Sequence, residues 1–166
     1  CAGVLEAYWW TTDVYTMYYS AALCDRLSLL GNDTSIAPLT VLKQRQSPDG
    51  WWPSRFDMGP CTFTTGLAIL TAHLLCADDD SLSILAARHL LGAQLSDGSW
   101  PAKPILVIPS PHMTCHDPDV SWRVDEPGHP NVLSDENRIL ATAVALRALF
   151  VLGGGTPSTL RRRPPR

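Results

Sequence analysis

The sequence predicts an all-α protein built from helical hairpins, and three observations support this prediction. Five segments of the 166-residue chain place apolar residues at helical spacing. Longer segments that are apolar on most sides alternate with shorter amphipathic ones. Each amphipathic segment ends in nearly the same turn, since residues 46–52 read QSPDGWW and residues 94–100 read QLSDGSW. A repeat of about 50 residues indicates an array in which no hairpin covers its own apolar face.

The elements follow in a regular order. We expect longer, largely buried helices over residues 12–30, 61–76 and 135–152, where small residues are mixed with apolar ones. Ser134 is a plausible N-cap of the last helix, and the glycine run that starts at Gly153 ends it. Amphipathic helices are expected over residues 35–46 and 81–94, because their apolar residues recur on one helical face.

The two repeated turns share residue types that explain their shape. Each holds a glycine for the turn, an aspartate that can bond the turn's own backbone, and a following proline that prevents further helix. We call residues 46–52 the first turn motif and residues 94–100 the second turn motif. The aspartate, glycine and following proline are Asp49, Gly50 and Pro53 in the first copy, and Asp97, Gly98 and Pro101 in the second.

Composition limits the classes of function. With 45% hydrophobic and 17% charged residues, the chain can bury a core, and we expect one repeat domain over residues 1–153. Residues 154–166 read as a disordered basic tail, in which Arg161, Arg162 and Arg163 are solvated. A net charge of -3 argues against nucleic-acid binding.

The cysteines and the hydropathy pattern suggest a location. The chain has five cysteines, an odd number, and Cys24, Cys61 and Cys76 stand beside or within apolar helical patterns. There is no apolar run of transmembrane length and no signal-peptide pattern at the start. We therefore expect a cytoplasmic protein without disulfides, and contact with a membrane surface stays open.

The spacing Q-x-x-D-G-x-W resembles the QW repeats of squalene-hopene cyclases, oxidosqualene cyclases and other class II terpene cyclases. Prenyltransferases and squalene oxidase share this type of repeat. The resemblance covers residues 8–152 and is strongest to the C-terminal half of a squalene-hopene cyclase catalytic domain. In that family the Gln and Trp side chains tie the turn to the end of a neighbouring helix. The resemblance therefore implies a structural role for Gln46, Asp49, Gly50, Trp52, Gln94, Asp97, Gly98 and Trp100.

The resemblance implies an α/α toroid with inner and outer helices around an apolar cavity. A complete α6/α6 barrel needs six hairpins, and this chain shows about two and a half. Three explanations are open for this partial barrel. The chain is a fragment of a longer cyclase, or another subunit or a second copy completes the ring, or an open half-barrel exposes apolar surface that requires a partner.

The acid that starts class II cyclisation is not apparent. The family signature D-x-D-D keeps one carboxyl protonated because neighbouring like charges raise its pKa. Asp78, Asp79 and Asp80 are the nearest match, but Ala77 stands where the first Asp should be. We interpret this run as an acidic cap of the following helix. In the full-length family the D-x-D-D element lies upstream of the part that this chain resembles.

Aromatic residues gather near the start of the first predicted helix. Cyclases stabilise carbocations with aromatic faces, and the corresponding segment of squalene-hopene cyclases supplies such rings. Ordinary core packing explains the tyrosines equally well. The candidates for a substrate cavity are Trp9, Trp10, Tyr15, Tyr18, Tyr19 and Phe63.

Residues 101–133 form a proline-rich segment of about thirty residues, which is long for a connection. It contains His112, Cys115 and His116, types that bind zinc, but their spacing matches no zinc pattern. A surface loop is the preferred interpretation, a lid over the cavity is an intermediate one, and we expect neither a metal nor a cofactor.

Two classes of function follow. The first is a terpene cyclase-like enzyme, an isomerase that folds a polyprenyl or triterpene substrate, with the acid on a missing segment or a partner. The second is a non-catalytic repeat module that binds a prenyl chain or a protein. A zinc-dependent prenyltransferase ranks third, because its metal ligands are not evident in the sequence.

Overall fold

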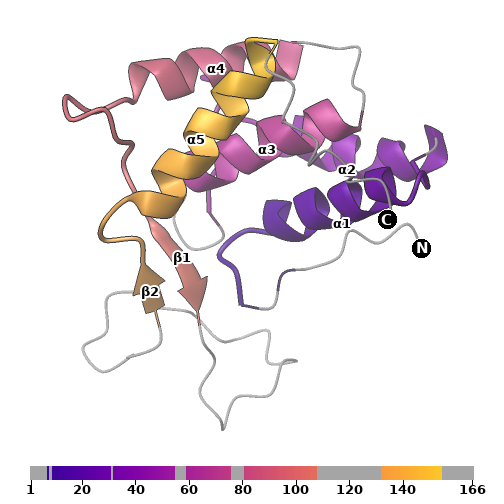
Figure 1. Cartoon of the computed structure of the whole chain (residues 1–166), viewed down its shortest axis with the longest axis horizontal. Coiled ribbons are helices and arrows are strands. Elements are labelled where there is room, and N and C mark those ends of the chain that lie inside the picture. The colour runs from indigo at the N-terminus through magenta and orange to yellow at the C-terminus, as the bar shows by residue number, and fades with distance from the viewer. Residues whose placement is uncertain are drawn as a thin grey trace, which may run out of the picture.

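The structure is a computed structural model that describes residues 7, 9–30, 32–54, 59–75, 81–107 and 132–154. Within these ranges the chain forms five helices and one small antiparallel sheet (Figure 1), so the prediction of an all-α fold is confirmed. The elements are α1 (Val14–Arg26), α2 (Asn32–Arg45), α3 (Thr62–Leu74), α4 (Ser81–Gly92), β1 (Pro104–Val107), β2 (Val132–Ser134) and α5 (Ile139–Leu152).

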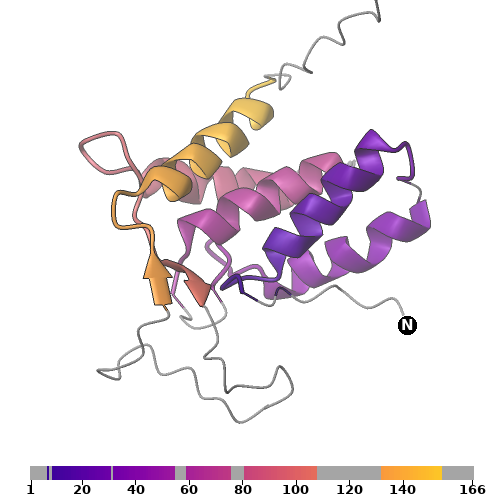
Figure 2. The same cartoon turned by 60° about the horizontal axis from the view of Figure 1, so that its bottom comes forward.

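Helix α3 is the centre of the molecule. It lies between α1 and α5 in both views and also packs against α4 (Figures 1 and 2). Every residue from 62 to 72 is buried, including four threonines. A helix that is apolar or small all round is typical of a position between other helices, as predicted for this segment.

Helices α1 and α5 are buried on one side only, so the prediction that they are covered on most sides is wrong for the described part of the chain. The buried side of α1 contains Val14, Met17, Tyr18 and Ala21. The buried side of α5 is a row of small residues, Ala141, Ala145 and Ala148, followed by Val151. Small residues let α5 approach α3 closely, while four of its large apolar residues are exposed, Ile139, Leu140, Leu146 and Phe150.

Helix ends differ from the predicted ones for local reasons. Helix α1 ends at Arg26 because Ser28 takes a left-handed conformation, with φ 56°, and the Leu29 amide then bonds back to the Cys24 carbonyl. Helix α5 begins at Ile139 and not at residue 135. Ser134 is the last residue of β2, so its predicted role as the N-cap of α5 is wrong.

A two-stranded sheet stands where the sequence indicated an irregular segment. Strands β1 and β2 pair in antiparallel fashion, with Pro104 opposite Ser134 and Leu106 opposite Leu133. The segment before α1 joins them, because Trp10 forms a bridge with Leu106 and the Thr11 amide donates to a β1 carbonyl at 3.0 Å. The sheet thus fixes the aromatic residues that precede α1.

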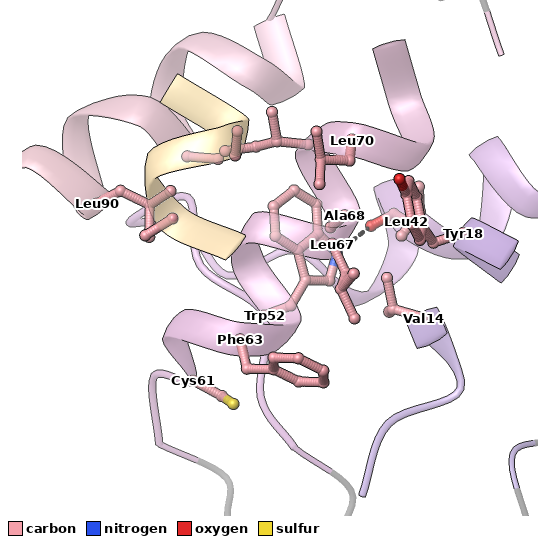
Figure 3. Close-up of a cluster of buried hydrophobic side chains, with 14 of the residues drawn as sticks. Val14, Tyr18, Leu42, Trp52, Cys61, Phe63, Leu67, Ala68, Leu70 and Leu90 are labelled. Carbon is pink, nitrogen blue, oxygen red and sulfur yellow. Dashed lines mark hydrogen bonds between the residues drawn. The ribbon is translucent and has the colours of Figure 1, made fainter. Parts of the chain in front are cut away.

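Trp52 lies among the buried apolar side chains of the core, as Figure 3 shows, and Trp100 belongs to the same cluster. Trp52 and Trp100 are almost completely buried, and all five helices contribute to the cluster. No helix within the described ranges is long and apolar enough to cross a membrane. Of the cysteines in these ranges, Cys24 and Cys61 are both free thiols, and burial raises the pKa of Cys61.

Candidate functional site

The first turn motif joins α2 and α4 through side-chain hydrogen bonds. The Trp52 indole N–H donates to the Leu42 carbonyl of α2 at 2.8 Å, a bond drawn in Figure 3. Gln46 Nε2 donates to the Gly50 carbonyl at 3.1 Å and to the Leu82 carbonyl, in the first turn of α4, at 2.9 Å. The motif therefore closes its own turn and holds the start of the next outer helix.

The second turn motif repeats the internal part of this arrangement. The Trp100 indole N–H donates to the Leu90 carbonyl of α4 at 2.6 Å, and Gln94 Nε2 donates to the Gly98 carbonyl at 3.0 Å. In both copies the tryptophan reaches back ten residues, to a buried leucine. A buried indole N–H requires an acceptor. The last position of each motif lets the tryptophan reach such an acceptor, the carbonyl ten residues earlier.

Each motif is also attached to the inner helix that follows it. The backbone N–H of Trp52 donates to Thr65 Oγ1 at 3.1 Å, and that of Trp100 donates to Thr142 Oγ1 at 3.2 Å. Both threonines are the fourth residues of their helices, α3 and α5. These two threonines could not be found from the sequence, because their equal positions emerge only once the structure starts α5 at Ile139 and not at residue 135.

Two titratable side chains in or beside the turn motifs, His89 and Asp97, have shifted pKa values. Burial lowers the pKa of His89, partly opposed by Asp49, and the His89 ring lies 6.5 Å from the Trp51 ring. Hydrogen bonds from Ser99 lower the pKa of Asp97, and Arg138 at 3.1 Å contributes to the same shift. Asp97 therefore braces the second turn motif through Ser99 and pairs with Arg138, the residue that precedes α5.

The aromatic candidates form a continuous set of ring contacts that we call the aromatic ladder. Trp10 stacks on Tyr15 with ring centroids 3.8 Å apart and on Phe63 at 5.7 Å. Tyr15 meets Tyr19 at 4.5 Å, and Tyr19 meets Tyr18 edge-on at 5.0 Å. The ladder thus joins the segment before α1, the outer part of α1 and the first turn of α3.

Exposure varies along the aromatic ladder. Phe63 and Tyr18 are buried, Trp10 and Tyr15 are half-buried, and Tyr19 is exposed. Burial raises the pKa of Tyr15, and Tyr19 adds to the shift, so the Tyr15 ring remains neutral. The contacts described above bring together five of the six predicted rings, and the sixth, Trp9, is exposed.

Tyr18 differs from the other tyrosines in its environment. Its ring belongs to the core cluster, and Arg147 of α5 places its guanidinium carbon 5.5 Å from the ring centroid. Burial raises the pKa of Tyr18, and Arg147 partly opposes the shift. This cation–π contact between α1 and α5 was not predicted, because the sequence does not reveal that these two helices lie close together.

Several predicted site residues lie outside the described residues. They are Asp78, Asp79 and Asp80 of the acidic run, and His112, Cys115 and His116 of the proline-rich segment. Among the residues that the structure describes, no group of histidine, cysteine and carboxylate side chains could hold a metal ion. The carboxylate nearest in sequence to the aromatic ladder is Asp13, which accepts from the Ala7 amide and pairs with Arg45 at 3.2 Å.

Comparison with solved structures identifies the fold. The chain is similar to the apo structure of the type II terpene cyclase MstE from Scytonema, with a TM-score of 0.74 and 22% sequence identity. The match covers 93% of this chain and 48% of that chain. No protein-family model matches the chain, and no curated protein sequence matches it. The fold is therefore that of type II terpene cyclases, and the chain corresponds in length to about half of the matched one.

Proposed function

We propose that this chain forms part of a terpene cyclase-like enzyme that cyclises a polyprenyl or triterpene substrate through carbocation intermediates. The observation that carries the proposal is the aromatic ladder on a terpene-cyclase fold. The rings that precede α1, lie on α1 and stand at the start of α3 carry electron-rich π-systems, which attract cations. An apolar surrounding strengthens that attraction because water does not compete with the rings.

The individual rings have separate roles in this proposal. Trp10 and Tyr15 are half-buried and stacked, so they are the candidates for direct contact with a cationic carbon. Phe63 supports Trp10 from α3, and Tyr19 extends the ladder toward solvent. Tyr18 faces Arg147, whose charge would repel a carbocation, and it serves as a core residue that positions Tyr19.

The proton donor belongs to another segment or another chain. Asp13 uses its oxygens to hold Ala7 and Arg45, an arrangement that suits a structural carboxylate more than an acid catalyst. Class II cyclisation requires a carboxyl that keeps its proton beside other carboxylates.

The test uses a prenyl amine that is protonated at neutral pH as a carbocation mimic, with a neutral ether of equal length as its isostere. Binding to the purified chain is followed by tryptophan fluorescence. A cation–π contribution of about 0.5–2 kcal/mol predicts a roughly 2- to 30-fold preference for the amine. Tyr15→Leu and Trp10→Leu keep the site apolar but remove the π faces, so both variants should lose the preference.

Trp51→Leu is the matched control, because the Trp51 ring is half-buried against His89 and outside the aromatic ladder. This variant should keep the preference for the amine. Equal binding of the amine and the ether by the unmodified chain would contradict the cyclase proposal. That result would instead support the alternative, a non-catalytic module that binds prenyl chains for their apolar length alone.

A further inference from the structure

Helix α5 has two stripes of apolar residues on opposite sides. The inner stripe packs toward α3 and consists of small residues, Ala141, Ala145 and Ala148. The outer stripe is exposed, and we call it the α5 seam, which consists of Ile139, Ala143, Leu146 and Phe150. Successive helical residues are rotated by about 100°, so the four seam side chains lie within about 60° of one another, opposite the alanines.

The α5 seam has the spacing of a coiled-coil interface. Its residues follow one another at intervals of four, three and four, which is the a/d pattern of a heptad. Three of them are large and open to solvent, since Ile139 is 66% exposed, Leu146 54% and Phe150 58%. Figure 2 shows α5 at the edge of the helices, with α3 between it and α1. The seam is therefore an apolar helix surface that can take a further helix.

The α5 seam is complementary to itself when two copies of the helix run antiparallel. A twofold axis between Ala143 and Leu146 places Ala143 of each copy opposite Leu146 of the other. The same axis places Ile139 of each copy opposite Phe150 of the other. Every layer then pairs a smaller side chain with a larger one, which fills the space between the helices.

A parallel pair fits the α5 seam less well. It would place Ala143 opposite Ala143 and Phe150 opposite Phe150, which leaves one layer underfilled and crowds another. Antiparallel helices also place opposite ends of their dipoles side by side. Arg147 is the one charged residue of α5 and lies over the Tyr18 ring. In the antiparallel pair the two Arg147 residues are more than one helical turn apart, so no like charges meet in the interface.

We propose that two copies of this chain associate through the α5 seam as an antiparallel helix pair about a twofold axis. The partner is a second copy because each seam residue finds its complement in the same four residues, as an isologous interface requires. Four layers make a small interface, so the dimer forms reversibly as the concentration rises. The inference concerns assembly and does not depend on the cyclase chemistry proposed above.

Sedimentation equilibrium of the full chain over a range of concentrations tests the proposal. The mass should rise from the 18.2 kDa of one chain toward twice that value. Leu146→Gln keeps the helix propensity but places a polar group in two layers of the twofold pair, so dimerisation should weaken at least tenfold. Leu23→Gln is the matched control, because Leu23 is 60% exposed on α1 and lies outside the seam, and this variant should dimerise normally.

Both variants are also compared where the chain is a monomer. Below the dissociation constant, association adds nothing to stability, so each variant should unfold in urea close to the midpoint of the unmodified chain. A loss of dimer in Leu146→Gln with this midpoint retained assigns the effect to the α5 seam and not to misfolding.

Two charge variants test the antiparallel register. Ala143→Glu and Leu146→Lys should each dimerise weakly alone, because every introduced charge is buried without a partner. In their mixture the introduced carboxylate faces the introduced ammonium in one layer, while the other layer is unchanged. The mixture should therefore associate more tightly than either variant alone.

Three results would overturn the proposal. The first is a mass of 18.2 kDa at every concentration that the chain reaches in solution. The second is a dimer that Leu146→Gln and Leu23→Gln weaken equally, since the seam would then have no special part in it. The third is a mixture of the two charge variants that associates no better than either variant alone, because positions 143 and 146 would then not meet.

Discussion

Two tryptophans and two glutamines carry most of the polar chemistry of the turn motifs. Each indole N–H is buried and has one carbonyl acceptor ten residues earlier. The same tryptophan side chain therefore fills the core and satisfies a carbonyl near the C-terminal end of the outer helix. The glutamines act at the rim, where Gln46 is half-buried and Gln94 is exposed. Their side chains differ by a single hydrogen bond, which makes them a natural pair for measurement.

Replacing each glutamine by alanine should separate the two roles. Gln46→Ala removes bonds to the Gly50 and Leu82 carbonyls, whereas Gln94→Ala removes only the bond to the Gly98 carbonyl. A hydrogen bond contributes about 1 kcal/mol, so Gln46→Ala should lower the free energy of unfolding by about 1 kcal/mol more than Gln94→Ala. Urea denaturation followed by tryptophan fluorescence measures this difference.

The m-value should be the same for both variants, because neither changes the area exposed on unfolding to a large degree. Equal losses of stability would mean that the contact between Gln46 and α4 contributes nothing in solution. A greater loss for Gln94→Ala would contradict the assignment of its single acceptor.

At the level of elements, the start of α5 shows how a helix is capped from a distance. Asp135 is 8% exposed and lies three residues before Arg138, which has a left-handed φ of 57°. Its two carboxylate oxygens accept from the backbone amides of Ile139 and Ala141 at 2.9 and 2.8 Å. The negative charge also faces the positive end of the helix dipole. Asp135 therefore takes the role that the sequence had suggested for Ser134.

Asp135→Ala should lower the free energy of unfolding by about 1–2 kcal/mol, because two backbone amides in the first turn of α5 lose their acceptor. Thermal and urea denaturation measure the loss. Glu136→Ala is the control, since Glu136 is an exposed neighbouring carboxylate and should change stability by less than about 0.5 kcal/mol. A comparable loss in both variants would show that negative charge near the start of α5 matters, and that the two hydrogen bonds to Asp135 do not.

The sequence predicts the elements that depend on local pattern and misses those that depend on distant pairing. Periodicity locates all five helices, and Gly50 and Gly98 mark the turns because positive φ is a local requirement. Strands β1 and β2 could not be predicted, since Leu106 pairs with Leu133 only after the fold brings them together. The end of α1 at Arg26 was missed for a similar reason, as nothing in the sequence requires positive φ at Ser28.

The aromatic ladder shows the same limit at the candidate site. The density of rings around residues 9–19, with Phe63, predicts which residues are involved. It does not predict their order, because Trp10 reaches Phe63 and Tyr15 through the backbone bridge between Trp10 and β1. The contact of Tyr18 with Arg147 likewise joins α1 to a helix far along the chain.

For the whole molecule, the decisive feature is the asymmetry of the array. Helix α3 is enclosed, while the helices on either side of it expose large apolar residues, among them Leu23 on α1 and Leu146 on α5. Exposed apolar residues form a binding surface where they make up a contiguous patch. The described residues thus form a stable centre with two open ends.

This asymmetry predicts opposite results for one substitution at equivalent positions. Ile69→Gln places a polar side chain at a site that is 1% exposed and should lower the free energy of unfolding by about 3 kcal/mol or more. Leu146→Gln changes a site that is 54% exposed, and glutamine has nearly the helix propensity of leucine, so stability should change by less than about 0.5 kcal/mol. Urea denaturation gives both values. If the Leu146 variant instead lost as much stability as the Ile69 variant, the outer side of α5 would be covered in the isolated chain. The array would then already be closed at this end.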